Sequence, residues 1–287
     1  MWEKISNHIS ETQGISFQTL KAYPIGGGCI NETYQIKDKN KCYFVKLNNE
    51  NTIDMLAAEA DALREIAATK TIRVPSPICL GVINRKAYLV LEYIPFSKRK
   101  FIPQTQLGKH LAKLHAIPQQ KFGWHRNNHI GSNTQLNPYN ENWPEFFRKY
   151  RIEFQINLAK ANGFQINRTK FIFKKIDDFF SDYKPKPALL HGDLWNGNFA
   201  FDETGTPFVF DPATYYGDRE AEFGLTEMFG GFRSDFWKGY EEVLPLDQGF
   251  PKRQLLYQLY HTLNHLNLFG SSYADSAKKL INKLDNY

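Results

Sequence analysis

The residues best suited to chemistry lie between His191 and Asp211. This stretch offers a carboxylate at Asp193, an amide at Asn198 and a second carboxylate at Asp211. Phosphoryl transfer from a nucleotide needs such a set, because one carboxylate orients and deprotonates the attacking hydroxyl while an amide oxygen and another carboxylate hold magnesium on the phosphates. We therefore predict that Asp193 is the catalytic base and that Asn198 and Asp211 bind Mg²⁺. The alternative is a polar turn between strands, in which Asp and Asn are ordinary turn residues.

Two longer motifs contain these residues. Protein kinases use an Asp, an Asn five residues later and then a metal-binding Asp at a strand end, in the same order. Here the motifs read HGDLWNGN from His191 and FDPATYYGDREAEFGLTEMFGGF from Phe210. With them the chain, from about Ile25 to its end, resembles the fructosamine-3-kinase (ketosamine-3-kinase) family within the aminoglycoside phosphotransferase and choline kinase group. The Trp after HGDL, DPA in place of DFG, YYGDRE and MFGGF carry the resemblance.

The resemblance implies an α+β, bilobal, protein-kinase-like fold. A small antiparallel-sheet N-lobe would span residues 1–95, and a larger, mainly helical C-lobe would span residues 96–287. It further implies ATP and Mg²⁺ as cofactors. The implied reaction is phosphorylation of the sugar 3-hydroxyl of a ketosamine, small or protein-linked, in deglycation repair.

Two other functions stay open. The chain could be another small-molecule kinase, acting on an aminoglycoside or an amino alcohol, although DLWNGN and MFGGF argue against it. It could also be a nucleotide-binding regulator without turnover, although every catalytic position is filled. No APE sequence or long phosphorylatable loop follows Asp211, which favours a small-molecule substrate.

Three residues are candidates for substrate binding. Trp195 follows the expected base closely and could stack on the sugar face, with a core Trp as the alternative. Asp218 and Glu220 could contact sugar hydroxyls or the substrate amine. Arg219, which lies between them, could instead form a salt bridge with either one.

A glycine triplet near the N-terminus indicates a nucleotide loop. Gly26, Gly27 and Gly28 are not a Walker A sequence, because no GK[ST] follows them. They fit a flap over ATP phosphates, where bare backbone N–H groups approach the anion, or simply a turn. Cys29 follows at the expected tip and is a candidate redox-sensitive thiol. Because glycine-rich strands have weakly specified register, the loop could also exchange between subunits, so we expect a monomer or a homodimer.

A lysine inside an apolar strand supports the nucleotide site. Lys46 lies in FVKL, about where kinases place the lysine that holds the phosphates and pairs with a helix glutamate. Glu59 is the expected partner, favoured by the resemblance, and Glu65 on the same predicted helix is the rival. An outward-facing lysine and a solvated glutamate are the alternatives.

The adenine-binding hinge is expected where the apolar strand 87–94 ends. In kinase-like folds the backbone at this point bonds to adenine, so Glu92 and Tyr93 are the candidate residues. A plain core strand is the alternative.

Periodic apolar residues predict the elements that position these groups. The expected elements are helices over 1–12, 54–68, 103–117, 142–157 and 171–180, strands over 17–25, 33–36, 41–47 and 87–94, and a hairpin with strands at 199–201 and 208–210.

The composition bounds the remaining possibilities. The chain has 287 residues, 42% of them hydrophobic, and a net charge of +6, which suits an anionic substrate such as ATP. No nucleic-acid motif or membrane-spanning run is apparent, so we expect neither partner. Three cysteines without metal-ligand spacing and the lack of a secretory signal predict a cytoplasmic protein.

Overall fold

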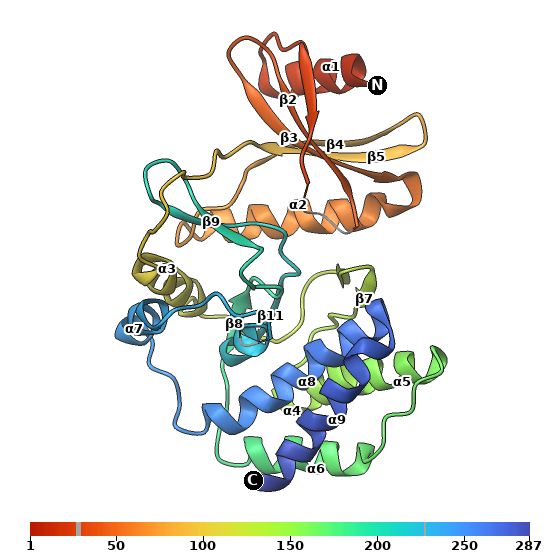
Figure 1. Ribbon diagram of the computed structural model, residues 1–287, viewed down its shortest axis with the longest axis vertical. Helices are drawn as coiled ribbons and strands as arrows, with labels where there is room; N and C mark the ends of the chain where they lie inside the picture. The colour runs from red at the N-terminus through yellow and green to blue at the C-terminus, as the bar shows by residue number, and fades with distance from the viewer. Residues whose placement is uncertain (27–29, 227) are drawn as a thin grey trace. The chain divides into compact units, whose positions relative to one another are not determined.

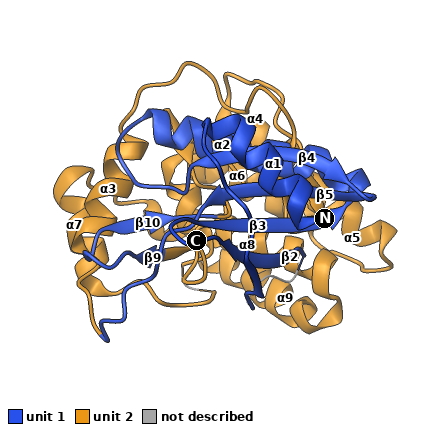
Figure 2. Cartoon of the chain, turned by 90° about the horizontal axis from the view of Figure 1, so that it is seen from above, with its two compact units in different colours: residues 1–100, 200–210 blue, residues 101–199, 211–287 orange. Residues whose placement is uncertain are grey.

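The chain divides into two units, each with its own core. The computed structural model describes residues 1–26, 30–226 and 228–287. Unit 1 comprises Met1–Lys100 and Ala200–Phe210, and unit 2 comprises Phe101–Phe199 and Asp211–Tyr287 (Figure 2). The sequence had suggested a single boundary after residue 95. In the structure the first segment of unit 1 instead extends to Lys100, and a short later segment, Ala200–Phe210, also belongs to unit 1.

Unit 1 is built on a five-stranded antiparallel sheet (Figure 1). Its strand order is β1-β2-β3-β5-β4. The strands are β1 (Lys21–Pro24), β2 (Glu32–Lys37), β3 (Cys42–Asn49), β4 (Pro77–Ile83) and β5 (Lys86–Glu92). The first three form the meander that the sequence predicts, although the first strand begins only at Lys21.

Two helices cover the sheet of unit 1. They are α1 (Trp2–Gln13) and α2 (Ile53–Ala68), the latter preceded by the short turn η1 (Glu50–Thr52). Ile5 and Ile9 of α1 are fully buried in one cluster with Val45 and Val90 of the sheet. The side chains of β3 alternate between the two faces, so its intervening residues point toward α2. Figure 1 shows α1 and α2 on opposite sides of the sheet.

A hairpin from late in the sequence completes unit 1. It consists of β9 (Phe199–Phe201) and β10 (Pro207–Val209). Isolated bridges join Arg73 to Phe208 and Phe96 to Asp202, and the ring of Phe96 packs on that of Phe208 with centroids 5.6 Å apart. Arg73 also forms an ion pair with Asp202. These contacts are why the hairpin belongs to unit 1.

Unit 2 is mainly helical. Its helices are α3 (Thr105–His115), α4 (Trp143–Phe147), the π-helical segment η2 (Arg148–Glu153), α5 (Phe154–Ala161), α6 (Thr169–Phe180), α7 (Ser234–Val243), α8 (Phe250–Phe269) and α9 (Ala274–Lys283), with short turns η3 (Arg219–Gly224), η4 (Ser271–Tyr273) and η5 (Leu284–Asn286). Two antiparallel strand pairs accompany them: β6 (Asn128–Ile130) with β7 (Asn133–Gln135), and β8 (Pro187–Leu190) with β11 (Tyr215–Asp218). Among the described residues, no helix is both long and apolar enough to cross a membrane.

Candidate active site

The β8–β11 pair positions the residues predicted to do chemistry. The segment containing Asp193 begins directly after β8, and Leu190 pairs with Tyr215 of β11. The Ala213 N–H donates to the His191 carbonyl over 2.9 Å. The HGD and DPA segments, which are twenty residues apart in sequence, therefore lie side by side.

Gly192 allows this close approach. Its φ is +83°, in the left-handed region, and a Cβ at this position would come within 2.1 Å of the Ala213 carbonyl oxygen. Any side chain would therefore push the two segments apart and strain the backbone. The glycine is a geometric requirement of this site.

Asn198 holds the predicted base. Its Nδ2 donates to the Asp193 carbonyl over 2.8 Å and to Asp193 Oδ2 over 3.1 Å. Burial of the carboxyl group and the charge of Asp211 raise the pKa of Asp193 to about 8, although the bond from Asn198 acts in the opposite direction. Asp193 is only partly buried by surface area, so contact with solvent moderates this effect.

Two of the three predicted residues, Asn198 and Asp211, carry oxygen donors of the kind that magnesium prefers. Because the Asn198 amide points its nitrogen at Asp193, its oxygen is turned the other way. Asp211 has a φ of +59°, a left-handed conformation that non-glycine residues adopt rarely and often at functional sites. Magnesium prefers oxygen ligands and is often held by one or two carboxylates together with substrate phosphates. Asn198 and Asp211 fit that description.

Glu222 is a functional residue that the sequence reasoning missed. Its wholly buried carboxylate accepts hydrogen bonds from the backbone N–H groups of His191 (2.6 Å) and Gly192 (2.9 Å). His115 contacts it through Nε2 over 3.3 Å and contacts Tyr240 through Nδ1. Burial alone would raise the pKa of Glu222, but the bond with His115 and the bond from Gly192 hold it below its usual value. The only signal in the sequence is an acidic residue between Ala221 and Phe223.

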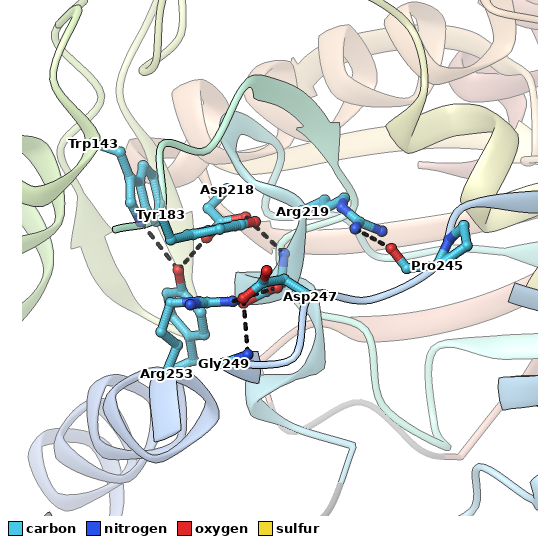
Figure 3. A network of polar contacts seen from close by, with 10 residues as sticks. Trp143, Tyr183, Asp218, Arg219, Pro245, Asp247, Gly249 and Arg253 are labelled. Atoms are coloured by element: carbon cyan, nitrogen blue, oxygen red, sulfur yellow. Dashed lines mark hydrogen bonds and ion pairs between the residues drawn. The ribbon is translucent and has the colours of Figure 1, made fainter. Parts of the chain in front are cut away.

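Asp218 and Glu220, the other candidates for substrate binding, bond to residues of the protein itself. Both are fully buried. Asp218 accepts from the hydroxyls of Tyr183 (3.1 Å) and Tyr257 (2.6 Å), and Trp143 donates to Tyr257 over 3.1 Å (Figure 3). Burial and the charge of Glu220 raise the pKa of Asp218. The Asp218 carboxylate thus already accepts two hydrogen bonds from the protein.

The alternative in which Arg219 forms a salt bridge with Asp218 or Glu220 is not seen among the described residues, where Glu220 pairs with Arg253. Arg253 of α8 donates two hydrogen bonds to the Glu220 carboxylate, of 2.7 and 3.0 Å, and a further one to Asp247. Arg219 instead donates to the Leu244 and Pro245 carbonyls (Figure 3 shows the latter bond). This network fixes η3, and with it Glu222, to α8.

Trp195 is partly exposed beside the predicted base. Its ring packs over Gly197, where a Cβ would lie 2.3 Å from the indole, and it contacts Phe229 with centroids 5.4 Å apart. The alternative of a core tryptophan is therefore not what the structure shows. The ring is available for a ligand.

In unit 1 the predicted ion pair is present. Lys46 Nζ lies 2.7 Å from Glu59 Oε1, and the two side chains are 4% and 12% exposed. Lys46 points toward α2 because it alternates with the core residues Val45 and Leu47 along β3. The pairing of Lys46 with Glu59 is thus confirmed, and the rival Glu65 is not the partner shown.

Glu92 of the expected hinge is bonded to neighbouring residues of unit 1. Glu92 ends β5, its N–H donates to the Ser76 carbonyl, and its carboxylate pairs with Arg73 over 2.9 Å. The N–H of Glu92 is therefore already used within the protein, and the adenine-binding role of Glu92 and Tyr93 stays a prediction.

Part of the glycine loop can be placed. Gly26 is exposed and has open space around its Cα. Gly27, Gly28 and Cys29 lie outside the described residues, and with them the predicted redox role and the exchange between subunits. Of the other thiols, Cys79 is buried, which raises its pKa to about 12.

Comparison with solved structures defines the class of fold. The structure of an aminoglycoside phosphotransferase, APH(4)-Ia, matches with a TM-score of 0.61 at 14% identity, covering 99% of this chain and 97% of that chain. At this identity the likeness shows the fold alone. The predicted α+β, protein-kinase-like fold is confirmed, with its antiparallel sheet in unit 1 and its helices mainly in unit 2.

The sequence comparisons define the family within that class. A sequence model of the fructosamine kinase family matches residues 1–286. A probable ketoamine kinase from Synechocystis sp. is 42% identical over 281 residues, covering 98% of this chain and 95% of that protein. The structure of a candidate fructosamine-3-kinase from Haemophilus somnus matches with a TM-score of 0.92 at 33% identity, covering 99% of this chain and 97% of that one. The chain belongs to the fructosamine kinase family.

Proposed function

We propose that this chain is an ATP-dependent kinase that phosphorylates the sugar 3-hydroxyl of ketosamines. The observation that carries the proposal is the cluster in which Asn198 holds Asp193 while the charge of Asp211 acts on it. Phosphoryl transfer depends on positioning and on charge compensation, and this cluster supplies groups for both. Membership of the fructosamine kinase family supports the substrate class.

Residues of unit 2 would act on the sugar. Asp193 would orient the 3-hydroxyl and accept its proton, and Asn198 would fix the orientation of that carboxylate. Asn198 and Asp211 would hold Mg²⁺, which when bound offsets negative charge on the transferring phosphoryl group. The partly exposed ring of Trp195 would stack on the sugar face.

Residues of unit 1 would bind the nucleotide. Lys46, held in place by Glu59, would contact the phosphates, and the Gly26–Gly28 loop would offer backbone N–H groups to them. The backbone at Glu92 and Tyr93 would bind adenine. An adenine-binding site implies that the phosphate donor is a nucleotide such as ATP and not a phosphate compound that lacks a nucleobase.

The reaction would remove sugar adducts from amines. A phosphate at the 3-position is a better leaving group than a hydroxyl, so the phosphorylated adduct decomposes and frees the amine. The substrate would be a small or protein-linked ketosamine. The cytoplasmic location expected from the sequence stays a prediction.

The test is ADP release with a fructosylated amine, with glucose as the control sugar and ³¹P and ¹H NMR to locate the phosphate. The Asp193→Asn variant should lose turnover by about 10²–10⁴-fold with little change in ATP affinity, because a positioned base acts on the transition state. Asp182→Asn, the same change at an exposed site of unit 2, should behave as wild type. Equal activity on kanamycin or choline would contradict the substrate class. No stimulation by any acceptor would favour a regulator.

A further inference from the structure

Five aromatic side chains form a continuous row in unit 2. The ring of Trp195 packs on Phe229 with centroids 5.4 Å apart, and Phe229 packs on His265 at 5.2 Å. His265 packs in turn on Phe269 at 5.5 Å and on Tyr273 at 5.1 Å. We call these five residues the aromatic row. It begins two residues after Asp193 in sequence and runs past Phe269, the last residue of α8, to Tyr273 in η4.

The aromatic row is open to solvent. Phe269 is 54% exposed and Phe229 is 39% exposed, while the other three rings are partly exposed. Single exposed aromatic residues are common on proteins, but a contiguous set beside a catalytic carboxylate is characteristic of a binding surface. The row therefore offers ring faces to a ligand that already lies at Asp193.

His265 adds a hydrogen-bond acceptor in the middle of the row. Its Nδ1 lies 2.8 Å from the His261 carbonyl oxygen, which can only accept, so Nδ1 carries the hydrogen. Burial lowers the pKa of His265, so the ring is neutral at neutral pH. In a neutral ring with hydrogen on Nδ1, Nε2 has a free lone pair. The row thus combines ring faces, which attract cations, with a neutral nitrogen that can accept from an N–H group.

We propose that the aromatic row binds the amine-bearing part of a ketosamine, with the secondary ammonium at Phe229 and His265 and the attached carbon chain along Phe269 and Tyr273. The inference rests on the proposed function and deepens it. The nitrogen of a ketosamine is bonded to C1, two carbons from the 3-position, so a sugar held at Asp193 and Trp195 places its ammonium beside the next ring. An unbranched alkyl chain, such as that of lysine, then continues along the exposed faces.

The order of the row predicts which variants affect which substrates. The test uses a series of fructosylated n-alkylamines, from methylamine to hexylamine, and measures KM and kcat separately. Wild type should show a KM that falls as the chain lengthens. Phe269→Ala should remove most of that trend and raise KM for the hexylamine adduct about fivefold, with kcat and the methylamine adduct nearly unchanged. Tyr139→Ala is the matched control, because Tyr139 is 56% exposed and lies outside the row.

The ammonium contact has its own test. His265→Leu should raise KM about fivefold for every adduct, whatever its chain length, because all of them carry the same nitrogen. His265→Gln keeps an acceptor oxygen and should raise KM less.

The outcomes separate this inference from the proposed function. If the adducts are phosphorylated but Phe269→Ala leaves the dependence on chain length intact, or Tyr139→Ala changes it equally, the aromatic row is not the amine subsite and the kinase function stands. If wild type phosphorylates no adduct, both are overturned. Loss of the chain-length trend in Phe269→Ala alone, with a uniform rise in KM in His265→Leu, is the expected result.

Discussion

Replacing Glu222 by glutamine would test whether its carboxylate holds the catalytic loop. The two oxygens accept from His191 and Gly192 at 2.6 and 2.9 Å in a fully buried position. Glutamine presents one oxygen and one NH₂ group, so one backbone N–H faces another donor. A buried donor without a partner costs about 1–3 kcal/mol, and a hydrogen bond to a charged group contributes about 1.5–3 kcal/mol. We expect Glu222→Gln to lower the free energy of unfolding by about 3 kcal/mol.

The same substitution should slow the reaction. A displaced Gly192 shifts the adjacent Asp193, and a misplacement of about 1 Å can lower turnover about 100-fold. The KM for ATP should change little, because the nucleotide residues of unit 1 are untouched.

Urea unfolding and steady-state kinetics measure both effects. Glu242→Gln is the control, since Glu242 makes an exposed ion pair with Lys109 over 2.9 Å, and losing such a pair costs at most about 1 kcal/mol. If Glu222→Gln matched Glu242→Gln in both stability and turnover, the reasoning about the loop would be refuted.

Three further predictions concern Lys46, Asp211 and His115. Lys46→Met leaves the mostly buried Glu59 carboxylate without the Lys46 cation, so the free energy of unfolding in urea should fall by about 3 kcal/mol and the KM for ATP should rise. Adding Glu59→Gln should restore part of the stability. A double variant no more stable than Lys46→Met would argue against the pair. Asp211→Gly and Asp211→Ala should both raise the Mg²⁺ concentration needed for half-maximal turnover. The free energy of unfolding should be about 1 kcal/mol higher for the glycine variant than for the alanine variant, because the φ of +59° at this position strains alanine but not glycine. Burial lowers the pKa of His115 despite its bond to Glu222, so the native state favours the neutral ring. Stability should therefore be full above about pH 6.5 and fall as the pH drops below it, by up to about 1.4 kcal/mol per pH unit, in unfolding measurements between about pH 7.5 and 5. The same slope in His115→Gln would assign the effect to another group.

The sequence predicts well those features that depend on local pattern. Lys46 is a charged residue inside an apolar strand. Because side chains alternate between the two faces of a strand, Lys46 lies on the face opposite Val45 and Leu47, toward α2. The sequence also predicts that Asn198 lies beside Asp193, and the structure shows the two side chains hydrogen-bonded. The segments that contain Asp193 and Asp211 lie close together because the strands next to them, β8 and β11, pair.

Features that depend on distant packing could not be predicted. Glu222 acts through backbone groups thirty residues away, and no local pattern marks that contact. Asp218 and Glu220 look like surface residues by type, yet both are buried, and Arg253 of α8 supplies the charge that makes burial of Glu220 possible. Residue type indicates which groups can form bonds but not which partner a fold provides.

The discontinuity of unit 1 has a consequence for biosynthesis. A ribosome releases Met1–Lys100 first, but the hairpin at Ala200–Phe210 that contacts Arg73 and Phe96 comes roughly 100 residues later, or about 5–20 s at typical elongation rates. During that interval Phe96 lacks the ring of Phe208 as a packing partner. The nascent segment Met1–Lys100 is therefore an incomplete folding unit that chaperones can recognise, and a truncated chain ending near Lys100 would never gain the packing of Phe96 on Phe208.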